Sequence, residues 1–411
     1  TYYCFIFYEP FTSTYFQNIT KLIFFLYIMC CDKEKDVLFS IKYLKKGTIV
    51  CVFYNISVYL SPKKDGYCRF KQKTMTRKQT GKIVLTLLLA SCAFGRVEAQ
   101  MVVRANRQVQ FEKTLPAGNY SGMSHFADNL YMLADDKYAS DGYRLVEIET
   151  DSVSGQIKNV VDKGFVVGAN NKNRDAEGVA FLPHRQSVMV VGEADSMIKE
   201  YSLDGKTEGR QLQLEKGVGN GGYESLAYDG YRGLLFTCTE NPLPDDLQTD
   251  DNEPWRFRIQ AIDESSLKVL GSWLYVADKP VGKAYKAGNY AFGISELTAL
   301  DNNKVLVLER ECYVPKKKIG AWVRNKIYCV TLSKNHGFSE NLYGSTQAVD
   351  KTLVYEWKTK MNLTARSFAN YEGMCLGPTL TDGSRTLLLC ADSQNQAHGV
   401  LKDWFMSLVI R

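Results

Sequence analysis

Residues 174–180 are Arg-Asp-Ala-Glu-Gly-Val-Ala, and after a turn they are followed by the apolar run Val188–Val191, which ends in Gly-Glu-Ala-Asp at residues 192–195. The order is a short strand with a carboxylate and a glycine, a turn, and a strand without polar residues. Continuous apolar runs of this length, bounded by turn residues, are typical of strands buried on both faces. The stretch therefore predicts two neighbouring strands of a buried sheet.

The same unit recurs along the chain, which indicates a repeat architecture. The other four copies pair a short strand with an apolar strand: Tyr120–Met123 with Asn129–Asp136, Tyr223–Ala227 with Gly233–Asn241, Ile294–Leu300 with Val305–Glu311, and Tyr371–Cys375 with Leu387–Asp392. Runs that alternate polar and apolar residues lie between the copies and predict half-buried outer strands: residues 143–149, 198–203, 256–262 and 326–332. No long amphipathic helix is indicated.

Four strands per unit without helices predict an all-β fold, a β-propeller built from four-stranded antiparallel sheets. At roughly 50 residues per blade, residues 100–411 are expected to form six blades. Only five units are visible. The sixth blade is expected within Thr237–Val281 or Val314–Trp357, or to be closed by the terminal strand Trp404–Ile410. The polar segment Asn241–Pro254 is predicted to be an inserted surface loop.

The formal net charge differs in sign between residues 1–99 and residues 100–411. The whole chain carries +6, but residues 1–99 hold 15 Lys and Arg against 6 Asp and Glu, which leaves 36 against 39 in residues 100–411. The repeat domain is therefore slightly acidic, and it lacks the basic surface that nucleic-acid binding requires.

The first 74 residues are expected to lie outside the propeller. They begin with Thr1 and are crowded with Tyr, Phe, Ile, Lys and Cys, the residues that translated AT-rich DNA yields. We interpret residues 1–74 as an upstream or non-structured extension. The alternative is a membrane-associated extension, although the apolar run Leu22–Met29 is shorter than the about 20 residues needed to span a bilayer.

Residues 75–99 have the three parts of an export signal. A positive region is followed by the apolar core Ile83–Ala90 and by the small-residue cleavage site Val97–Ala99. Alternatively, Leu89–Cys92 resembles a bacterial lipobox, in which Cys92 would carry a lipid anchor. Either interpretation predicts an exported protein, periplasmic or extracellular, whose residues 100–411 form one propeller domain without a transmembrane span.

Four glutamates occupy nearly the same place in the repeat: Glu177, Glu224, Glu296 and Glu372, with Ser121 in the first unit. In a propeller, equivalent positions of the innermost strands form a ring around the channel. Converging carboxylates repel one another by about 4 kcal/mol per pair at 4 Å and an effective dielectric near 20. Oxygen ligands suit Ca²⁺, so the four glutamates are a candidate calcium ring. Alternatively, each glutamate accepts backbone hydrogen bonds from a neighbouring blade and acts as a structural latch.

A second acidic tier is expected at the ends of the apolar strands, and its members are Asp135, Asp136, Glu193, Asp195, Glu240, Glu309, Glu311 and Asp392. Arg174 and Arg366 each lie a few residues ahead of a repeated glutamate. They are predicted either to pair with these acids or to bind phosphate through two parallel hydrogen bonds.

The repeated stretches Arg174–Ala180, Tyr223–Ala227, Ile294–Leu297 and Tyr371–Met374 resemble the phytase-like domain family, exported bacterial proteins described as having esterase-like activity of phytase. The resemblance covers roughly residues 115–410. It implies a propeller fold and hydrolysis of phosphoric esters, which calcium assists in the related propeller phytases.

Two functions are compatible with the sequence. The first is a Ca²⁺-dependent hydrolase of a small phosphate or related ester, with Arg174 and Glu177 as catalytic residues. The second is a non-catalytic propeller that binds a sugar, a peptide or an envelope partner through its rim loops.

Overall fold

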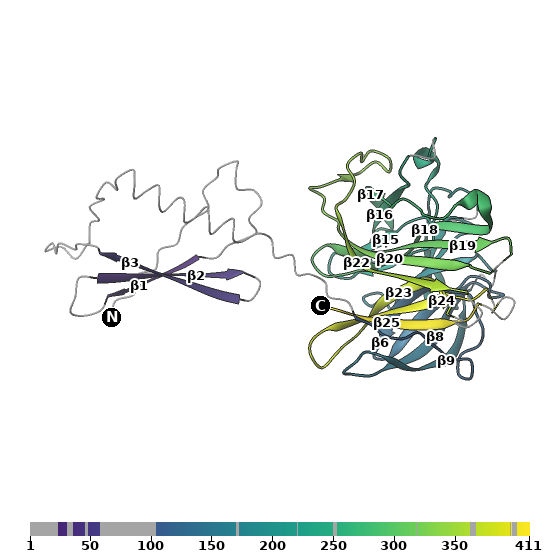
Figure 1. Ribbon diagram of the computed structural model, residues 1–411, viewed down its shortest axis with the longest axis horizontal. Coiled ribbons are helices and arrows are strands. Elements are labelled where there is room, and N and C mark those ends of the chain that lie inside the picture. Colours follow the sequence, from purple (N-terminus) through teal and green to yellow (C-terminus); the bar gives the residue numbers. More distant parts are fainter. Residues whose placement is uncertain are drawn as a thin grey trace. The chain divides into compact units, whose positions relative to one another are not determined.

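The computed structural model describes residues 24–30, 36–45, 48–57 and 104–411, except 170–171, 220, 250–252, 318, 362–366, 395 and 397–400. The chain divides into two compact units, Thr1–Val97 and Glu98–Arg411. In the first unit, β1 (Phe24–Cys30), β2 (Asp36–Lys45) and β3 (Thr48–Ser57) form an antiparallel sheet (Figure 1). The predicted export signal, Cys92 included, lies outside the described residues.

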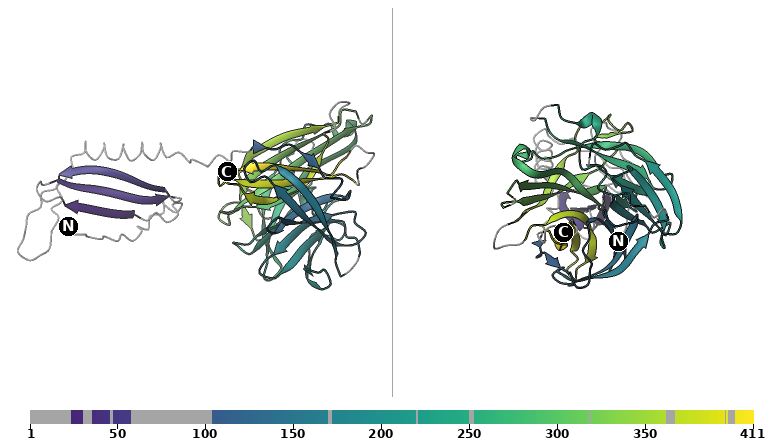
Figure 2. Two further views of the ribbon diagram at one scale, coloured as in Figure 1. Left: turned by 90° about the horizontal axis from the view of Figure 1, so that it is seen from below. Right: turned by 90° about the vertical axis from the view of Figure 1, so that its right-hand side faces the viewer.

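The second unit is a β-propeller, and its described residues form five antiparallel sheets, each of which is one blade. Figure 2 (right) shows the sheets arranged around a common centre. With the innermost strand given first, the first blade contains β6 (Tyr120–Ala127), β7 (Leu130–Asp135), β8 (Gly142–Thr150) and β9 (Ile157–Val167), and the second contains β10 (Ala176–Leu182), β11 (Ser187–Gly192), β12 (Met197–Ser202) and β13 (Glu208–Gln213). The third blade contains β14 (Ala227–Asp229), β15 (Leu234–Thr237), β16 (Arg256–Asp263), β17 (Lys268–Val276) and β21 (Phe338–Ser339), and the fourth contains β18 (Ala287–Ala299), β19 (Lys304–Pro315), β20 (Trp322–Thr331) and β22 (Lys351–Lys360). The fifth blade contains β23 (Asn370–Thr379), β24 (Arg385–Asp392), β25 (Trp404–Ile410) and β4 (Arg104–Ala105), and β5 (Val109–Gln110) also pairs with β25.

The expectation of six blades was wrong, because the blades are longer than the assumed average. The two segments considered for a sixth blade supply outer strands of the third and fourth blades and the connections between them. The strands of the fourth blade are long, with 13 residues in β18 and 12 in β19. The terminal strand β25 is the third strand of the fifth blade, and β4 from the start of the propeller pairs with it, so strands from both ends of the second unit meet in one blade.

The burial of the strands follows the sequence pattern. Every residue of β10 and β11 is buried, whereas the outer strand β13 alternates half-buried and exposed residues. The apolar core lies between neighbouring blades, as where Tyr120 and Phe405 join the first and fifth. The later halves of β6 and β23 are partly exposed, and together with the ends of β10, β14 and β18 they line a cavity shared by all five blades.

Two 3-10 helices, η1 (Pro244–Asp246) and η2 (Ala284–Lys286), are the only helical elements among the described residues. No helix in this part of the chain is long and apolar enough to cross a membrane.

Candidate functional site

A β-bulge at the start of an inner strand places two of the repeated carboxylates, Glu177 and Glu372. In the second blade, Ala176 pairs with Gly192 and Gly178 with Val191, so that Glu177 is the extra residue between them. In the fifth blade, Tyr371 and Gly373 are paired in the same way around Glu372. A bulge turns the side chain of the extra residue away from the regular alternation of the strand. Glu177 and Glu372 are therefore equivalent, as the repeat predicts.

The fourth blade has the same bulge with a different residue in it. Ile294 pairs with Glu309 and Glu296 pairs with Leu308, so the extra residue is Ser295. Glu296 is therefore one position farther along the strand than Glu177 and Glu372. Because side chains alternate between the two faces of a strand, a shift of one residue changes where the side chain points.

Glu296 acts as the structural latch that the sequence left as an alternative. Its Oε2 accepts hydrogen bonds from the backbone N–H groups of Met123 in the first blade (3.4 Å) and Met374 in the fifth (3.5 Å). Its Oε1 accepts the N–H of Leu297 (3.0 Å). Burial raises the pKa of Glu296 well above its ordinary value, while these three donors oppose the shift. This carboxyl ties three blades together and belongs to neither acidic group described below.

The bulges define two tiers of equivalent residues around the centre. The first tier holds the bulge residues and Glu224, which follows the bridge between Tyr223 and Thr239: Ser121, Glu177, Glu224, Ser295 and Glu372. On each second strand, one residue pairs with the residue just before the first-tier position, and the next residue along that strand belongs to the second tier. The second tier therefore holds Asp136, Glu193, Glu240, Arg310 and Asp392. The fourth blade thus supplies serine and arginine where the other blades supply mostly acids.

Arg310 neutralises the side of the site formed by the third and fifth blades. Its guanidinium forms ion pairs with Glu240 and Glu372, and it also donates to Asn370 Oδ1 (3.0 Å). All three charged side chains are at least nine-tenths buried, so each carboxylate depends on the arginine for compensation. Burial raises the pKa of Glu372, and the Arg310 guanidinium opposes this shift because it stabilises the charged carboxylate.

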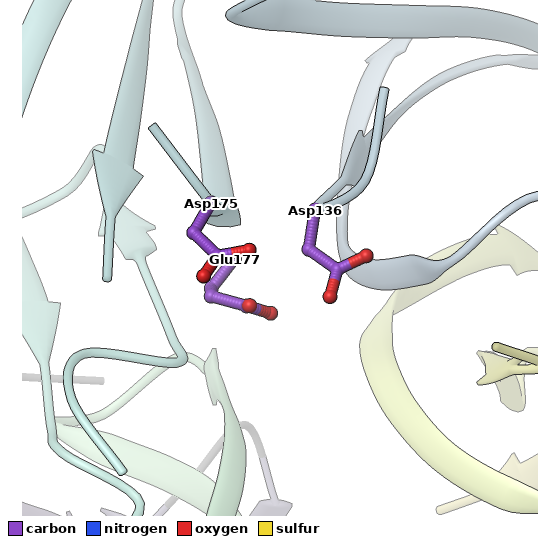
Figure 3. A group of neighbouring side chains, drawn as sticks. All are labelled: Asp136, Asp175 and Glu177. Carbon is purple, nitrogen blue, oxygen red and sulfur yellow. The ribbon is translucent and has the colours of Figure 1, made fainter. Parts of the chain in front are cut away.

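At the junction of the first three blades, no lysine or arginine of the described residues forms an ion pair with Glu177, Glu193 or Glu224. Carboxylate oxygens of Glu177, Glu193 and Glu224 lie within 4.8 Å of one another, and so do those of Asp136, Asp175 and Glu177 (Figure 3). Figure 3 shows Asp136 reaching from the first blade toward Asp175 and Glu177 at the start of β10. Glu177 belongs to both groups, which makes it the centre of the acidic cluster.

Glu177 and Glu224 are 5% and 6% exposed, and neither carboxylate has a hydrogen-bond or ion-pair partner among the described residues. Burial raises the pKa of both well above the ordinary value, and the neighbouring carboxylates raise it further. Glu193 is held by the N–H of Gly222 (2.8 Å). The two carboxylates therefore have no donor from the protein and are available to a ligand or to water.

Lys137 is the cation nearest to the cluster. Its Nζ lies 2.9 Å from Asp136 and 2.6 Å from Asp175, and its side chain is 49% exposed. Burial lowers the pKa of this lysine, but hydrogen bonds to the two aspartates outweigh that effect and raise it. Asp175 itself is held at a φ of 57°, in the left-handed region that few residues other than glycine adopt.

Arg174 has its donors occupied within the protein. Its Nε and one terminal nitrogen bind the two carboxylate oxygens of Asp195 (2.7 and 2.9 Å), and the other terminal nitrogen binds Asp141 (2.8 Å). It also donates to the carbonyl of Met197 (2.6 Å) and is 4% exposed. The ion-pair prediction for Arg174 matches these contacts, and its predicted catalytic role stays untested. Arg366 lies outside the described residues.

Two further acids that the sequence predicted at the ends of the apolar strands, Glu309 and Glu311, form hydrogen bonds outside the acidic cluster. Glu309 accepts from Tyr275 and Lys351, and Glu311 accepts from the N–H groups of Val281 and Gly282. Sequence reasoning did not single out Asp175, Lys137 and Arg310 as site residues. A signal for Arg310 was present, because a charged residue inside the buried run Val305–Glu311 needs a buried partner.

Comparison with known proteins agrees with this architecture. The model of the phytase-like family, described as "Esterase-like activity of phytase", matches residues 115–394. The chain belongs to the phytase-like family. The match spans the five inner strands and every residue of both tiers, so the acidic cluster lies within the family's domain. The comparison with curated proteins gives no match.

Solved structures with a similar arrangement are distant in sequence. A chain of the nidogen/laminin complex is 9% identical, covers 70% of this chain and 83% of its own length, and has a TM-score of 0.33. The RRP9 WD40 repeats are 8% identical, cover 75% of this chain and 98% of their own length, and have a TM-score of 0.36. The propeller description therefore rests on the strand order and pairing given above.

Proposed function

We propose that this phytase-like propeller is an exported, divalent-metal-dependent hydrolase of small phosphate or related esters, and that its ion is Ca²⁺. The observation that carries the proposal is the pair Glu177 and Glu224, two buried carboxylates without donors beside a third, Glu193. The family's description as esterase-like supports the same reaction class.

The chemistry of the donor set fits a hard cation. All the candidate ligands are carboxylate oxygens, which Ca²⁺ prefers, and it takes six to eight oxygens in flexible geometry. Glu177, Glu193 and Glu224 would hold the ion, with Asp136 and Asp175 as neighbouring ligands. Of the four glutamates predicted as ligands, Glu296 and Glu372 are already engaged by backbone donors and by Arg310. We therefore place the ion at the Glu177 side of the ring.

When bound, a divalent cation polarises a phosphoryl oxygen and lowers the pKa of a coordinated water. The protein itself would contribute positive charge for the substrate and ion pairs that hold the acidic residues in position. Lys137, half exposed beside Asp136 and Asp175, is placed to donate to an anionic oxygen of the substrate. Arg310 fixes Glu240 and Glu372, and Arg174 fixes the loop that leads into β10 through Asp141 and Asp195. Both arginines are positioning residues in this proposal.

The test is an assay of purified residues 100–411 against generic phosphate and acyl esters, with Ca²⁺ and with a chelator. We expect turnover that the chelator removes and that Glu224→Gln reduces at least tenfold. Glu296→Gln changes an equally buried carboxyl outside the cluster, so it should retain the Ca²⁺ dependence of turnover. Absence of chelator-sensitive turnover on either ester class, together with unchanged melting on addition of Ca²⁺, would refute the proposal.

The alternative function is binding through the rim loops without catalysis. A separate observation favours a binding site on the rim: a cleft lies between two loops of the third and fourth blades.

A further inference from the structure

Two loops enclose a cleft of about 760 Å³ at the junction of the third and fourth blades. One loop follows β15 and contributes Gln248, Thr249 and Glu253–Trp255, and the other joins β17 to β18 and contributes Ala277–Tyr285. Tyr290 at the start of β18 also lines the space. We call this space the loop cleft. None of its lining residues belongs to the acidic cluster.

Glu311 holds the second wall of the loop cleft, Ala277–Tyr285, in place. Oε1 of Glu311 accepts the N–H groups of Val281 (2.9 Å) and Gly282 (2.6 Å) and the hydroxyl of Tyr290 (3.0 Å). One buried carboxylate therefore holds both the loop and the aromatic ring at its base. A wall built this way keeps its shape without a ligand, which reduces the entropy lost on binding.

The first wall is fixed by contacts of its own. The carboxylate of Glu253 accepts the N–H (2.9 Å) and the hydroxyl (3.1 Å) of Thr249, which joins these two lining residues directly. The Trp255 ring packs edge-on against Phe292, with 4.9 Å between the ring centres. The half-buried Trp255 is thereby held with part of its surface on the cleft.

The exposed lining combines an aromatic ring with positive charge. Tyr285 is 76% exposed on η2, and the ammonium of Lys286 lies 5.7 Å from its ring centre. Lys279 and Lys283 line the cleft, are exposed, and form no ion pair within the described part of the chain. The cleft therefore presents an open aromatic ring beside two ammonium groups.

Positive charge is concentrated on the second wall of the loop cleft. Residues 277–290 hold three lysines against one acid, Asp278, which is paired with Lys326 and Lys351, whereas the first wall contributes Glu253. The field over the second wall therefore favours an anion, although the domain's net charge does not. Aromatic faces pack against the apolar face of a sugar ring, and ammonium groups bind its acidic substituents.

We propose that the loop cleft is a binding site for an acidic saccharide, which stacks on Tyr285 and directs its carboxylate or phosphate groups to Lys279 and Lys283. The site is independent of the proposed hydrolysis, because it uses no residue of the acidic cluster. In this proposal, the aromatic and basic residues of the rim recognise a charged sugar.

Isothermal titration calorimetry on the purified protein with a galacturonic acid trisaccharide tests the proposal. The matched ligands are the neutral trisaccharide maltotriose, a sugar phosphate and inorganic phosphate. We expect the acidic trisaccharide to bind at least tenfold more tightly than maltotriose, and binding to weaken as salt is added. Tighter binding of the sugar phosphate than of the uronate would identify phosphate as the acidic group and would support the same site.

Two variants locate the site, and each has a matched control. Tyr285→Ala and the double variant Lys279→Gln with Lys283→Gln should each weaken binding at least tenfold without changing the melting temperature, because all three side chains are exposed. The controls are Tyr231→Ala, a tyrosine that is 95% exposed outside the cleft, and the exposed Lys268→Gln, and both should bind like the wild type. Equal binding of acidic and neutral sugars, binding of inorganic phosphate as tight as that of the saccharide, no binding at millimolar ligand, or wild-type affinity in Tyr285→Ala would each overturn the proposal.

Discussion

Replacing both Glu177 and Glu224 with glutamine is expected to stabilise the metal-free protein and to abolish its stabilisation by Ca²⁺. In the wild type, carboxylate oxygens of Glu177, Glu193 and Glu224 lie within 4.8 Å of one another. Two unit charges at that distance repel by about 3.5 kcal/mol at an effective dielectric near 20. Proton uptake relieves part of this repulsion, since the pKa of both glutamates is raised by burial and by neighbouring carboxylates. We therefore expect a gain of about 1 to 3 kcal/mol in the free energy of unfolding without metal.

The response to Ca²⁺ should change in the opposite direction. An ion present at 100 times its Kd stabilises the folded state by about 2.7 kcal/mol. For a propeller of this size that corresponds to a rise of about 5 °C in Tm. The double variant keeps the side-chain shapes but loses two negative charges, so it should lose this rise.

The assay is thermal unfolding of chelator-treated protein, followed by circular dichroism with and without Ca²⁺. Glu296→Gln is the matched control, because it makes the same chemical change at a buried carboxyl outside the cluster. It should lower the metal-free Tm, because an amide replaces an acceptor of three backbone donors, and it should retain the Ca²⁺ response. The reasoning is refuted if the double variant has no higher Tm than the wild type in chelator and if Ca²⁺ raises its Tm as much as it raises that of the wild type.

Three further perturbations probe the ring. Arg310→Met leaves two buried glutamates without their cation and should lower the free energy of unfolding by about 3 to 5 kcal/mol in urea titration; a loss below 1 kcal/mol would show that the ion pairs are dispensable. Gly178→Ala places a Cβ 2.7 Å from the backbone nitrogen of Leu226 in the next blade and should cost about 1 to 3 kcal/mol, which an unchanged Tm would contradict. At Glu200, burial raises the carboxyl pKa, but hydrogen bonds from two arginines and a serine lower it to about 2. Its stabilisation is therefore complete above the ordinary pKa of 4.5 and is lost as pH falls through about 2. Glu200→Gln should remove about 2 kcal/mol at pH 7 and much less at pH 2, and an equal loss at both would rule out this linkage.

The repeat in the sequence was sufficient to predict the propeller and much of the first tier. The bulge residues Ser121, Glu177 and Glu372 and the neighbouring Glu224 stand where the repeated motif placed them. The number of blades was predicted wrongly, because an average blade length ignores the loops and long strands of the third and fourth blades. The Ca²⁺ ring, the export signal and the catalytic residues stay predictions, supported to the extent described above.

The sequence pattern did not predict the position of Glu296, which lies one residue beyond the bulge. It was aligned with the other glutamates although it follows Ile294 by two residues, whereas Glu224 and Glu372 each directly follow a tyrosine. Strand register decides such a difference, because one residue changes the direction of a side chain. Closer attention to the residue before the glutamate would have identified the shift.

The sequence by itself therefore determined which strands are buried and where the five repeated units lie. These properties follow from periodicity and burial, which are local. Only the tertiary structure decided which acids are compensated, because Arg310 of the fourth blade pairs with Glu240 of the third and Glu372 of the fifth. That pairing leaves Glu177, where the motif Arg174–Ala180 begins the second blade, beside Glu193 and Glu224 without a cation. Charge compensation acts through space across the ring, so no stretch of the chain contains it.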